Sequence, residues 1–172
     1  MGRRASIENR EFTGIRVQVD TAVPLDDVIR RLRGLMGQTS IPDVVGLAQK
    51  VRSGEEYVRE VSKRFVGESG FMLFSEIDHG TWIERFGIKR RVLRWILGNP
   101  LIAITIIRHD IAAALFVPVE ILLAERLGGK GATVIYVRPS SLMAVGDNLD
   151  LLTAAQALDA KLDSLISRAT TA

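Results

Sequence analysis

Strict alternation of apolar and polar residues is the first regular pattern along the chain. Ile15, Val17 and Val19 alternate with polar residues over 12–19, and this period of two predicts a half-buried strand. Four later runs rich in β-branched and other apolar residues predict further strands at 71–77, 91–97, 113–126 and 132–138. The longest run contains Pro118, which has no N–H for a ladder and therefore marks an edge or a bulge.

Runs in which apolar residues recur three or four positions apart predict helices. Pro24 suits a first helical turn, and Ser53 with Glu56 has the spacing of a capping box. The predicted helices begin at Pro24, Ser40 and Ser53 and continue with spans at 81–86, 101–110 and 149–168. A helix with one apolar stripe covers another apolar surface, so the pattern predicts a sheet layer under a helix layer.

Gly98, Asn99 and Pro100 mark the sharpest change of pattern. The strand at 91–97 stops at Gly98. Asn99 is a favoured N-cap residue, and Pro100 suits the first turn of the next helix. That helix, at 101–110, is apolar almost all round, so we expect it to be buried on several sides. Its second side packs either within the monomer or on a second copy of the chain.

The element order predicts the α+β class. We expect a single layered domain with a mainly antiparallel sheet covered by helices. Gly128–Gly131 lies between two strand runs and is typical of a hairpin turn. We expect a loop at 139–148, before the last helix. Residues 1–10 are polar and predict a flexible N-terminal tail, which leaves 11–172 as the domain.

Composition narrows the class of protein. The chain has 172 residues, of which 47% are hydrophobic, and this suffices for one sizeable core. Cysteine is absent, so disulfides and thiolate metal sites are excluded, and we expect a cytoplasmic location. The longest uncharged apolar stretch is 95–107, which is shorter than the roughly 20 residues of a membrane span. We therefore expect no membrane partner.

The formal net charge of +3 makes the chain mildly basic. The densest basic cluster is Lys89–Arg91, followed by Arg94 and Trp95. Nucleic-acid binding needs several phosphate contacts and often stacking aromatic side chains. Acidic residues are spread throughout the chain and aromatic residues are only 6%. We interpret the cluster as the solvated start of a strand and expect no nucleic-acid partner.

Several short motifs together resemble a known family. They are Ser75–Gly80, Leu97–Leu101, Leu115–Val119, the glycine hairpin, the strand end Tyr136–Pro139 and the closing amphipathic helix. On these residues the chain is similar to the domain of unknown function family DUF302. The resemblance implies a small α+β domain that tends to form homodimers, and it implies no established reaction. Against the family pattern, residues of about 39–68 look like a helical insertion.

Asp78 and His79, at the end of a predicted strand, form the strongest polar pair. A carboxylate and an imidazole there could bind a metal or act as acid and base. Neighbouring residues on a strand point in opposite directions, which disfavours a shared metal, and an aspartate at a strand end is typical of a turn. We favour the turn, and we expect no metal site and no catalytic residue.

Arg108 and His109 lie at the end of the apolar helix, where basic side chains interact favourably with the helix dipole. They could instead meet an acidic ligand, or the histidines could ligate a haem iron, although no haem motif surrounds them. Asn99 is either an N-cap or a ligand contact at a helix N-terminus. Glu76 and Glu120 would form a carboxylate pair if their strands adjoined. We expect no cofactor.

These patterns predict a homodimeric domain that binds a small apolar or acidic ligand near the corner at 98–100. The candidate ligand-binding residues are Asp78, His79, Trp82, Trp95, Asn99, Arg108 and His109. Two alternatives stay open. One is an enzyme that uses Asp78 and His79 in a strand-end cleft, and the other is a purely structural or interaction protein.

Overall fold

A six-stranded sheet with the order β1-β6-β5-β4-β3-β2 organises the chain. The computed structural model describes residues 5–172. Neighbouring strands are antiparallel, except that β2 runs parallel to β3. The strands are β1 Arg16–Thr21, β2 Gly37–Gln38, β3 Met72–Asp78, β4 Val92–Gly98, β5 Val119–Glu125 and β6 Ala132–Val137.

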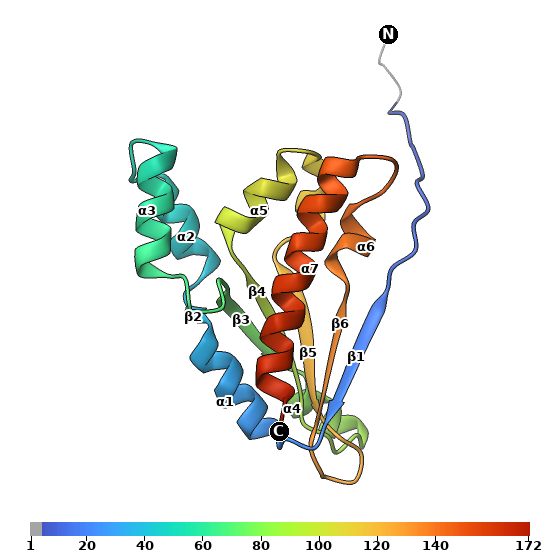
Figure 1. The fold of residues 1–172 in the computed structure, drawn as a ribbon. Coiled ribbons are helices and arrows are strands. Elements are labelled where there is room, and N and C mark those ends of the chain that lie inside the picture. The colour runs from blue at the N-terminus through green and yellow to red at the C-terminus, as the bar shows by residue number, and fades with distance from the viewer. Residues whose placement is uncertain (1–4) are drawn as a thin grey trace.

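Helices pack on one face of this sheet and at its ends. They are α1 Leu25–Leu35, α2 Ile41–Ala48, α3 Gly54–Arg64, α4 Gly80–Ile83, α5 Pro100–Ile107, α6 Pro139–Met143 and α7 Leu149–Thr170, with 3₁₀ turns η1 Glu84–Phe86 and η2 Ile111–Phe116. Figure 1 shows α1 and α7 in front of the sheet, while α2 and α3 project as a pair beyond its β2 edge. The predicted α+β class with a mainly antiparallel sheet is confirmed.

The core lies between the sheet and helices α1 and α7. Val134, Leu123 and Leu93 are cross-strand neighbours on β6, β5 and β4, and each is at least nine-tenths buried. Leu32 of α1 and Leu162 of α7 belong to the same apolar cluster and are fully buried. The period-two strands and the striped helices therefore meet as the sequence pattern predicts.

The predicted helix starts are correct where a local cap was visible. The Ser40 side chain accepts a hydrogen bond from the Asp43 amide (3.2 Å), and Ser53 accepts one from the Glu56 amide (3.1 Å). The Glu56 carboxylate in turn accepts from the Arg52 amide (2.8 Å). These bonds satisfy amide groups that the first helical turn leaves without partners.

Two predictions for the second half of the chain are wrong. The run at 113–126 is not one extended segment, because η2 occupies its first part and β5 begins only at Val119. Asp110 starts that 3₁₀ turn by accepting from the Ala112 amide (2.9 Å). The expected loop at 139–148 contains α6, whose start is held by Asp159 through the Ser140 amide (2.9 Å).

Helix α5 is less buried than its composition predicts. Ile106 is its only fully buried residue, and Ile104 is 48% exposed. The helix lies across one end of the sheet, where one side packs near α7 and another faces solvent (Figure 1). Of the two alternatives for its second side, packing within the monomer is therefore wrong, and packing on a second copy stays a prediction.

The N-terminal segment carries no helix or strand over 5–15 and is exposed there. Residues 1–4 of the predicted tail lie outside the described residues. Within 5–172, none of the helices combines the length and apolar character needed to cross a membrane.

Candidate functional site

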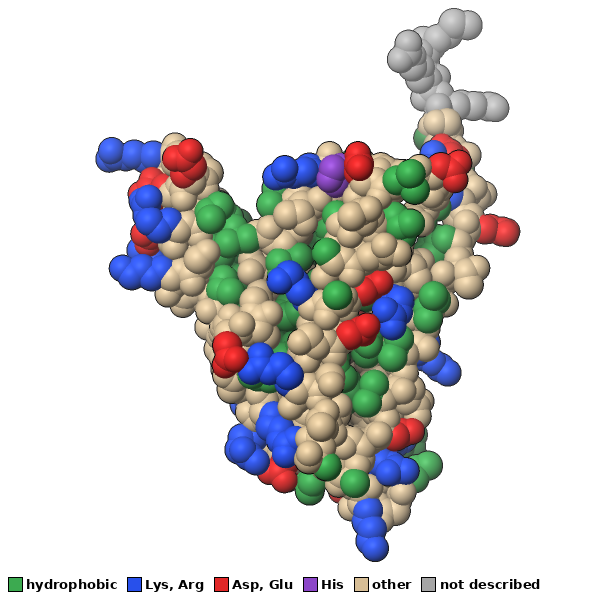
Figure 2. All heavy atoms as spheres, in the orientation of Figure 1, with side chains coloured by type: hydrophobic (Ala, Val, Ile, Leu, Met, Phe, Trp, Pro, Cys, Tyr) green, Lys and Arg blue, Asp and Glu red, His purple; other side chains and the backbone are tan. Residues whose placement is uncertain are grey.

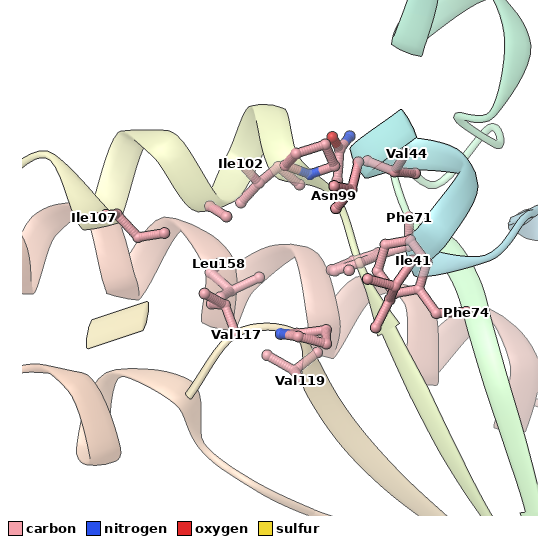
Figure 3. A pocket seen from close by; sticks show the side chains of 15 residues that line it. Ile41, Val44, Phe71, Phe74, Asn99, Ile102, Ile107, Val117, Val119 and Leu158 are labelled. Atoms are coloured by element: carbon pink, nitrogen blue, oxygen red, sulfur yellow. The ribbon is translucent and has the colours of Figure 1, made fainter. Parts of the chain in front are cut away.

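An apolar cavity of about 240 Å³ lies where β4 turns into α5. Its walls come from α2, the start of β3, the corner at 98–100, α5, the segment before β5, and α7 (Figure 3). Side chains that face it include Val44, Phe71, Phe74, Ile102, Val119 and Leu158. Figure 2 shows hydrophobic side chains on both walls of a cleft between the α2–α3 pair and the body of the protein. The corner that the sequence singled out therefore adjoins a cavity.

Asn99 holds this corner together. Its side-chain Oδ1 accepts a hydrogen bond from the Leu101 amide (2.8 Å), and its Nδ2 donates to the Gly70 carbonyl (2.8 Å). The Ile102 and Ala103 amides both donate to the Asn99 carbonyl, at 3.0 and 2.9 Å. Pro100, the first residue of α5, has no N–H, and the amides of the next three residues already donate to Asn99. The first turn of α5 therefore has no free donor for an anion. Asn99 lines the cavity as an N-cap whose polar groups are already used.

Gly98 sets the floor of the cavity. A Cβ atom at this position would lie 3.1 Å from the Pro118 Cβ and 3.2 Å from the Phe74 Cε2. Such distances are shorter than ordinary van der Waals contact between carbon atoms. The glycine thus lets the proline and the aromatic ring close on the corner from two sides.

Asp78 and His79 lie at the opposite end of β3 from the cavity. Asp78 accepts hydrogen bonds from the Thr81 amide (3.2 Å) and from the Thr81 hydroxyl (2.8 Å). These bonds hold the pKa of the Asp78 carboxyl below its usual value. His79 accepts through Nδ1 from the Trp82 Nε1 (3.1 Å). Each group serves the local turn, which is the interpretation that the sequence favoured.

Trp95 is a core residue and does not face the cavity. Its side chain is fully buried, and its Nε1 donates to Glu76 (2.6 Å). Glu76 also accepts from the Arg33 guanidinium (2.8 Å), whose Cζ lies 5.5 Å from the centre of the Trp95 ring. The hydrogen bond to Glu76 thus satisfies the indole N–H, the one polar group of the buried Trp95 side chain.

Glu76 and Glu120 do not form a carboxylate pair. Glu76 is the cross-strand neighbour of Trp95, whereas Glu120 is the neighbour of Ile96. Adjacent residues of β4 point to opposite faces, so the two carboxylates lie on different sides of the sheet. Glu120 is instead paired with Arg94.

Arg108 and His109 end α5 outside the cavity lining. The Arg108 Nε donates to the Ile104 carbonyl (3.2 Å), and the His109 amide donates to the Ile106 carbonyl (3.0 Å). Both side chains are exposed. Among residues 5–172, no three His, Cys, Asp or Glu side chains gather as metal ligands. Of the seven candidate residues, the structure brings only Asn99 to the cavity.

Two walls of the cavity have no local signal in the sequence. Ile41, Val44 and Val45 come from α2, within the segment that we interpreted as an insertion. Leu158 comes from the middle of α7, where its apolar stripe predicts burial but not a cavity. These positions meet only through the tertiary fold.

Fold and cavity together define the chain as an α+β domain with helices on one face of its sheet and an apolar site at one end. The family model for the domain of unknown function DUF302 matches residues 48–169, and the chain belongs to this family. The matched segment begins within α2 and includes α3. A helical insertion at about 39–68 stays a prediction.

The fold is shared with a solved structure. The crystal structure of the uncharacterized conserved protein DUF302 from Bacillus stearothermophilus superposes with a TM-score of 0.62 and 14% sequence identity. The likeness covers 89% of this chain and 96% of that chain. A comparison with curated proteins found no match.

Proposed function

We propose that this protein binds a small apolar molecule in the cavity beside the β4–α5 corner. The observation that supports this is an apolar cavity of about 240 Å³ next to a capped helix start. An apolar cavity of roughly 150 Å³ in another protein is already large enough to bind benzene. The space here therefore suits a molecule of one ring with an alkyl substituent. The proposal includes a cytoplasmic location, which a chain without cysteine permits.

The chemistry of the lining favours an apolar ligand over an acidic one. Among residues 5–172, no charged side chain contributes to it, and Asn99 is its only polar side chain. Both ends of the Asn99 carboxamide are already hydrogen-bonded. A carboxylate placed here would lose its hydration without gaining a partner, which is costly.

A series of alkylbenzenes from benzene to hexylbenzene tests the proposal. We expect binding to raise the melting temperature, because a ligand that binds the folded state stabilises it. The gain should increase with chain length until the cavity is full and then fall. Ala103→Phe, on the lining, should abolish the effect by filling the space. Ile104→Phe, on the exposed side of the same helix, is the matched control and should leave the rise in melting temperature unchanged.

No stabilisation by any member of the series would contradict the proposal. Equal loss of binding in both variants would also contradict it, because the effect would then come from a general disturbance of α5. Native mass spectrometry of the purified protein adds an independent measurement, since a bound apolar molecule adds its own mass.

The proposal also includes a homodimer formed through the outer face of the sheet. Within the described residues, α1 and α7 pack on the inner face, while Gln18, Ile77 and Glu120 on the outer face are exposed. Arg94 pairs with Glu120 near the middle of this face. A two-fold contact brings the same patch from each copy together. Arg94 of one copy can therefore pair with Glu120 of the other.

Sedimentation velocity separates the two surfaces on which a dimer could form. Leu122→Arg places a charge on the outer sheet face and should shift the protein to monomers. Ile104→Arg changes the exposed side of α5 and should leave the dimer intact. The opposite pattern would assign the contact to α5, and a monomeric wild-type protein would refute the dimer.

A further inference from the structure

Exposed apolar side chains gather at the end of the protein opposite the cavity. Four large ones are involved: Trp82 is 54% exposed, Phe86 77%, Ile88 53% and Leu127 86%. We call this end, formed by residues 78–91 and 125–130, the basic tip. Figure 1 shows its two segments side by side at the lower end of the sheet. The Arg90 Nε donates to the Glu125 carbonyl (2.7 Å), which joins the segments directly.

The aromatic side chains of the basic tip are held in place. The Trp82 and Phe86 rings meet edge to face with centroids 6.2 Å apart. The Trp82 Nε1 donates to His79 (3.1 Å), and their rings are 5.9 Å apart. Because its one polar atom is satisfied within the turn, the indole presents an apolar surface to solvent. Exposed aromatic pairs of this kind mark interaction sites.

Positive charge is concentrated at the same end. The two segments contain six basic and three acidic residues, so their net charge of +3 equals the formal net charge of the entire chain. The rest of the chain is balanced. Five of the six basic residues have no ion pair among residues 5–172: Arg85, Lys89, Arg90, Arg126 and Lys130. Figure 2 shows basic and hydrophobic side chains together at the lower end.

We propose that the basic tip docks on the surface of an anionic lipid bilayer. The exposed apolar side chains would enter the interfacial region, where tryptophan and other aromatic residues are favoured. The unpaired cations would lie against acidic headgroups, and each adds to the attraction. This surface contact requires no spanning helix. The proposal departs from the expectation of no membrane partner, which rested only on the lack of a spanning segment.

Two other occupants fit the basic tip less well. A symmetric contact with a second copy would press a surface of net charge +3 against itself. Phosphates of a nucleic acid would pair with the cations, and a base could stack on Trp82. A nucleic acid offers no apolar surface to Ile88 and Leu127, however. Of these three occupants, the anionic bilayer alone, with its apolar layer beneath the headgroups, uses both the charges and the aliphatic side chains.

Co-sedimentation with lipid vesicles tests the proposal. We expect the full chain to bind vesicles of phosphatidylcholine with phosphatidylglycerol at about 0.1 M salt, to bind phosphatidylcholine alone weakly, and to be released by higher salt. Lys89→Ala with Lys130→Ala should lower the partition coefficient about 25-fold, at about five-fold for each lost charge. Trp82→Ser with Phe86→Ser should lower it by an order of magnitude or more through lost apolar burial.

Matched variants control for general effects of charge and exposure. Lys50→Ala with Arg52→Ala removes two exposed basic residues elsewhere, and Ile111→Ser with Leu115→Ser removes two exposed apolar ones. Both pairs should bind vesicles as the wild type does. All four changed surfaces are exposed, so circular dichroism should show the same fold in each variant.

Tryptophan fluorescence gives a second measurement. The chain has two tryptophans, and only Trp82 is exposed, because Trp95 is fully buried. Anionic vesicles should shift the emission to shorter wavelength, and Trp82→Phe should remove the shift. Failure to bind anionic vesicles, or equal binding by the tip variants, would overturn the proposal. Tighter binding to single-stranded RNA, or a change from dimer to monomer in the tip variants, would overturn it by assigning another partner.

Discussion

The Asn99 carboxamide joins Gly70 to the start of α5. Its Nδ2 donates to the Gly70 carbonyl across 2.8 Å, although the two residues are 29 positions apart. Its Oδ1 meanwhile caps the helix at the Leu101 amide. Since Phe71 follows Gly70 and lines the cavity, this one side chain fixes the relative position of two cavity walls.

Replacing Asn99 should separate its two roles. Asn99→Ala removes the cap and leaves the Gly70 carbonyl without its donor, and we expect a loss of about 2 kcal/mol in the free energy of unfolding. Asn99→Ser keeps a capping oxygen but loses the donor, so we expect about half of that loss. Urea unfolding at neutral pH measures both. Equal stability of Asn99→Ala and the wild type would show that the corner is held by packing alone.

Gly34 and Gly37 should respond in opposite directions to alanine. Gly34 lies within α1 with open space around it, so Gly34→Ala should stabilise by about 0.5–1 kcal/mol. A Cβ at Gly37 would lie 1.6 Å from the Phe65 carbonyl oxygen. Gly37→Ala must therefore push β2 away from the segment after α3.

Thermal unfolding of the two glycine variants checks this prediction. We expect the melting temperature of Gly37→Ala to fall by several degrees or more, and that of Gly34→Ala to rise slightly. A neutral Gly37→Ala variant would mean that β2 is not packed against the chain as described.

What the sequence could predict depends on how far apart the interacting residues lie. Ser40, Ser53 and Asn99 each cap a helix through an amide two or three residues ahead, so the starts of those helices were predictable. Helix α6 was missed because Asp159, nineteen residues away, holds its first turn. That bond exists only after α7 has packed against α6.

The candidate site, too, was predictable only where the interacting residues are close together in the sequence. The change of pattern at 98–100 located the corner, and Asn99 lines the cavity there. Asp78 and Trp82 were chosen for their chemistry, but β3 carries them to the far end of the sheet. Proximity in a cavity depends on the tertiary fold, so residue type alone did not separate the lining from the rest.

Tyr136 should make the protein less stable at alkaline pH. Burial, together with its hydrogen bond to Asp163, raises the pKa of the Tyr136 hydroxyl well above its usual value. The folded state therefore keeps the phenol protonated when an unfolded chain would ionise it. This contribution to stability is fully present below about pH 10 and is lost as the pH rises further.

Urea unfolding between neutral and strongly alkaline pH measures this effect. Tyr136→Phe should cost about 1 kcal/mol at neutral pH through the lost hydrogen bond, and it should lose less stability above pH 10 than the wild type. Tyr57, whose pKa burial also raises, gives the comparison variant Tyr57→Phe. An alkaline loss that is unchanged in Tyr136→Phe would show that the hydroxyl is not protected in the folded state.

Leu158 and Leu162 offer a final test of the cavity, because both are buried on α7 but only Leu158 faces the cavity. Either change to alanine should cost about 2–5 kcal/mol, since each deletes buried methyl groups. Leu158→Ala alone should enlarge the cavity and move the preferred alkylbenzene to a longer chain. Ligand at about 100 times its dissociation constant should then raise the free energy of unfolding of Leu158→Ala by about 2.7 kcal/mol. Leu162→Ala should lose stability while keeping the wild-type preference, and the same shift in both variants would mean that the ligands do not occupy this cavity.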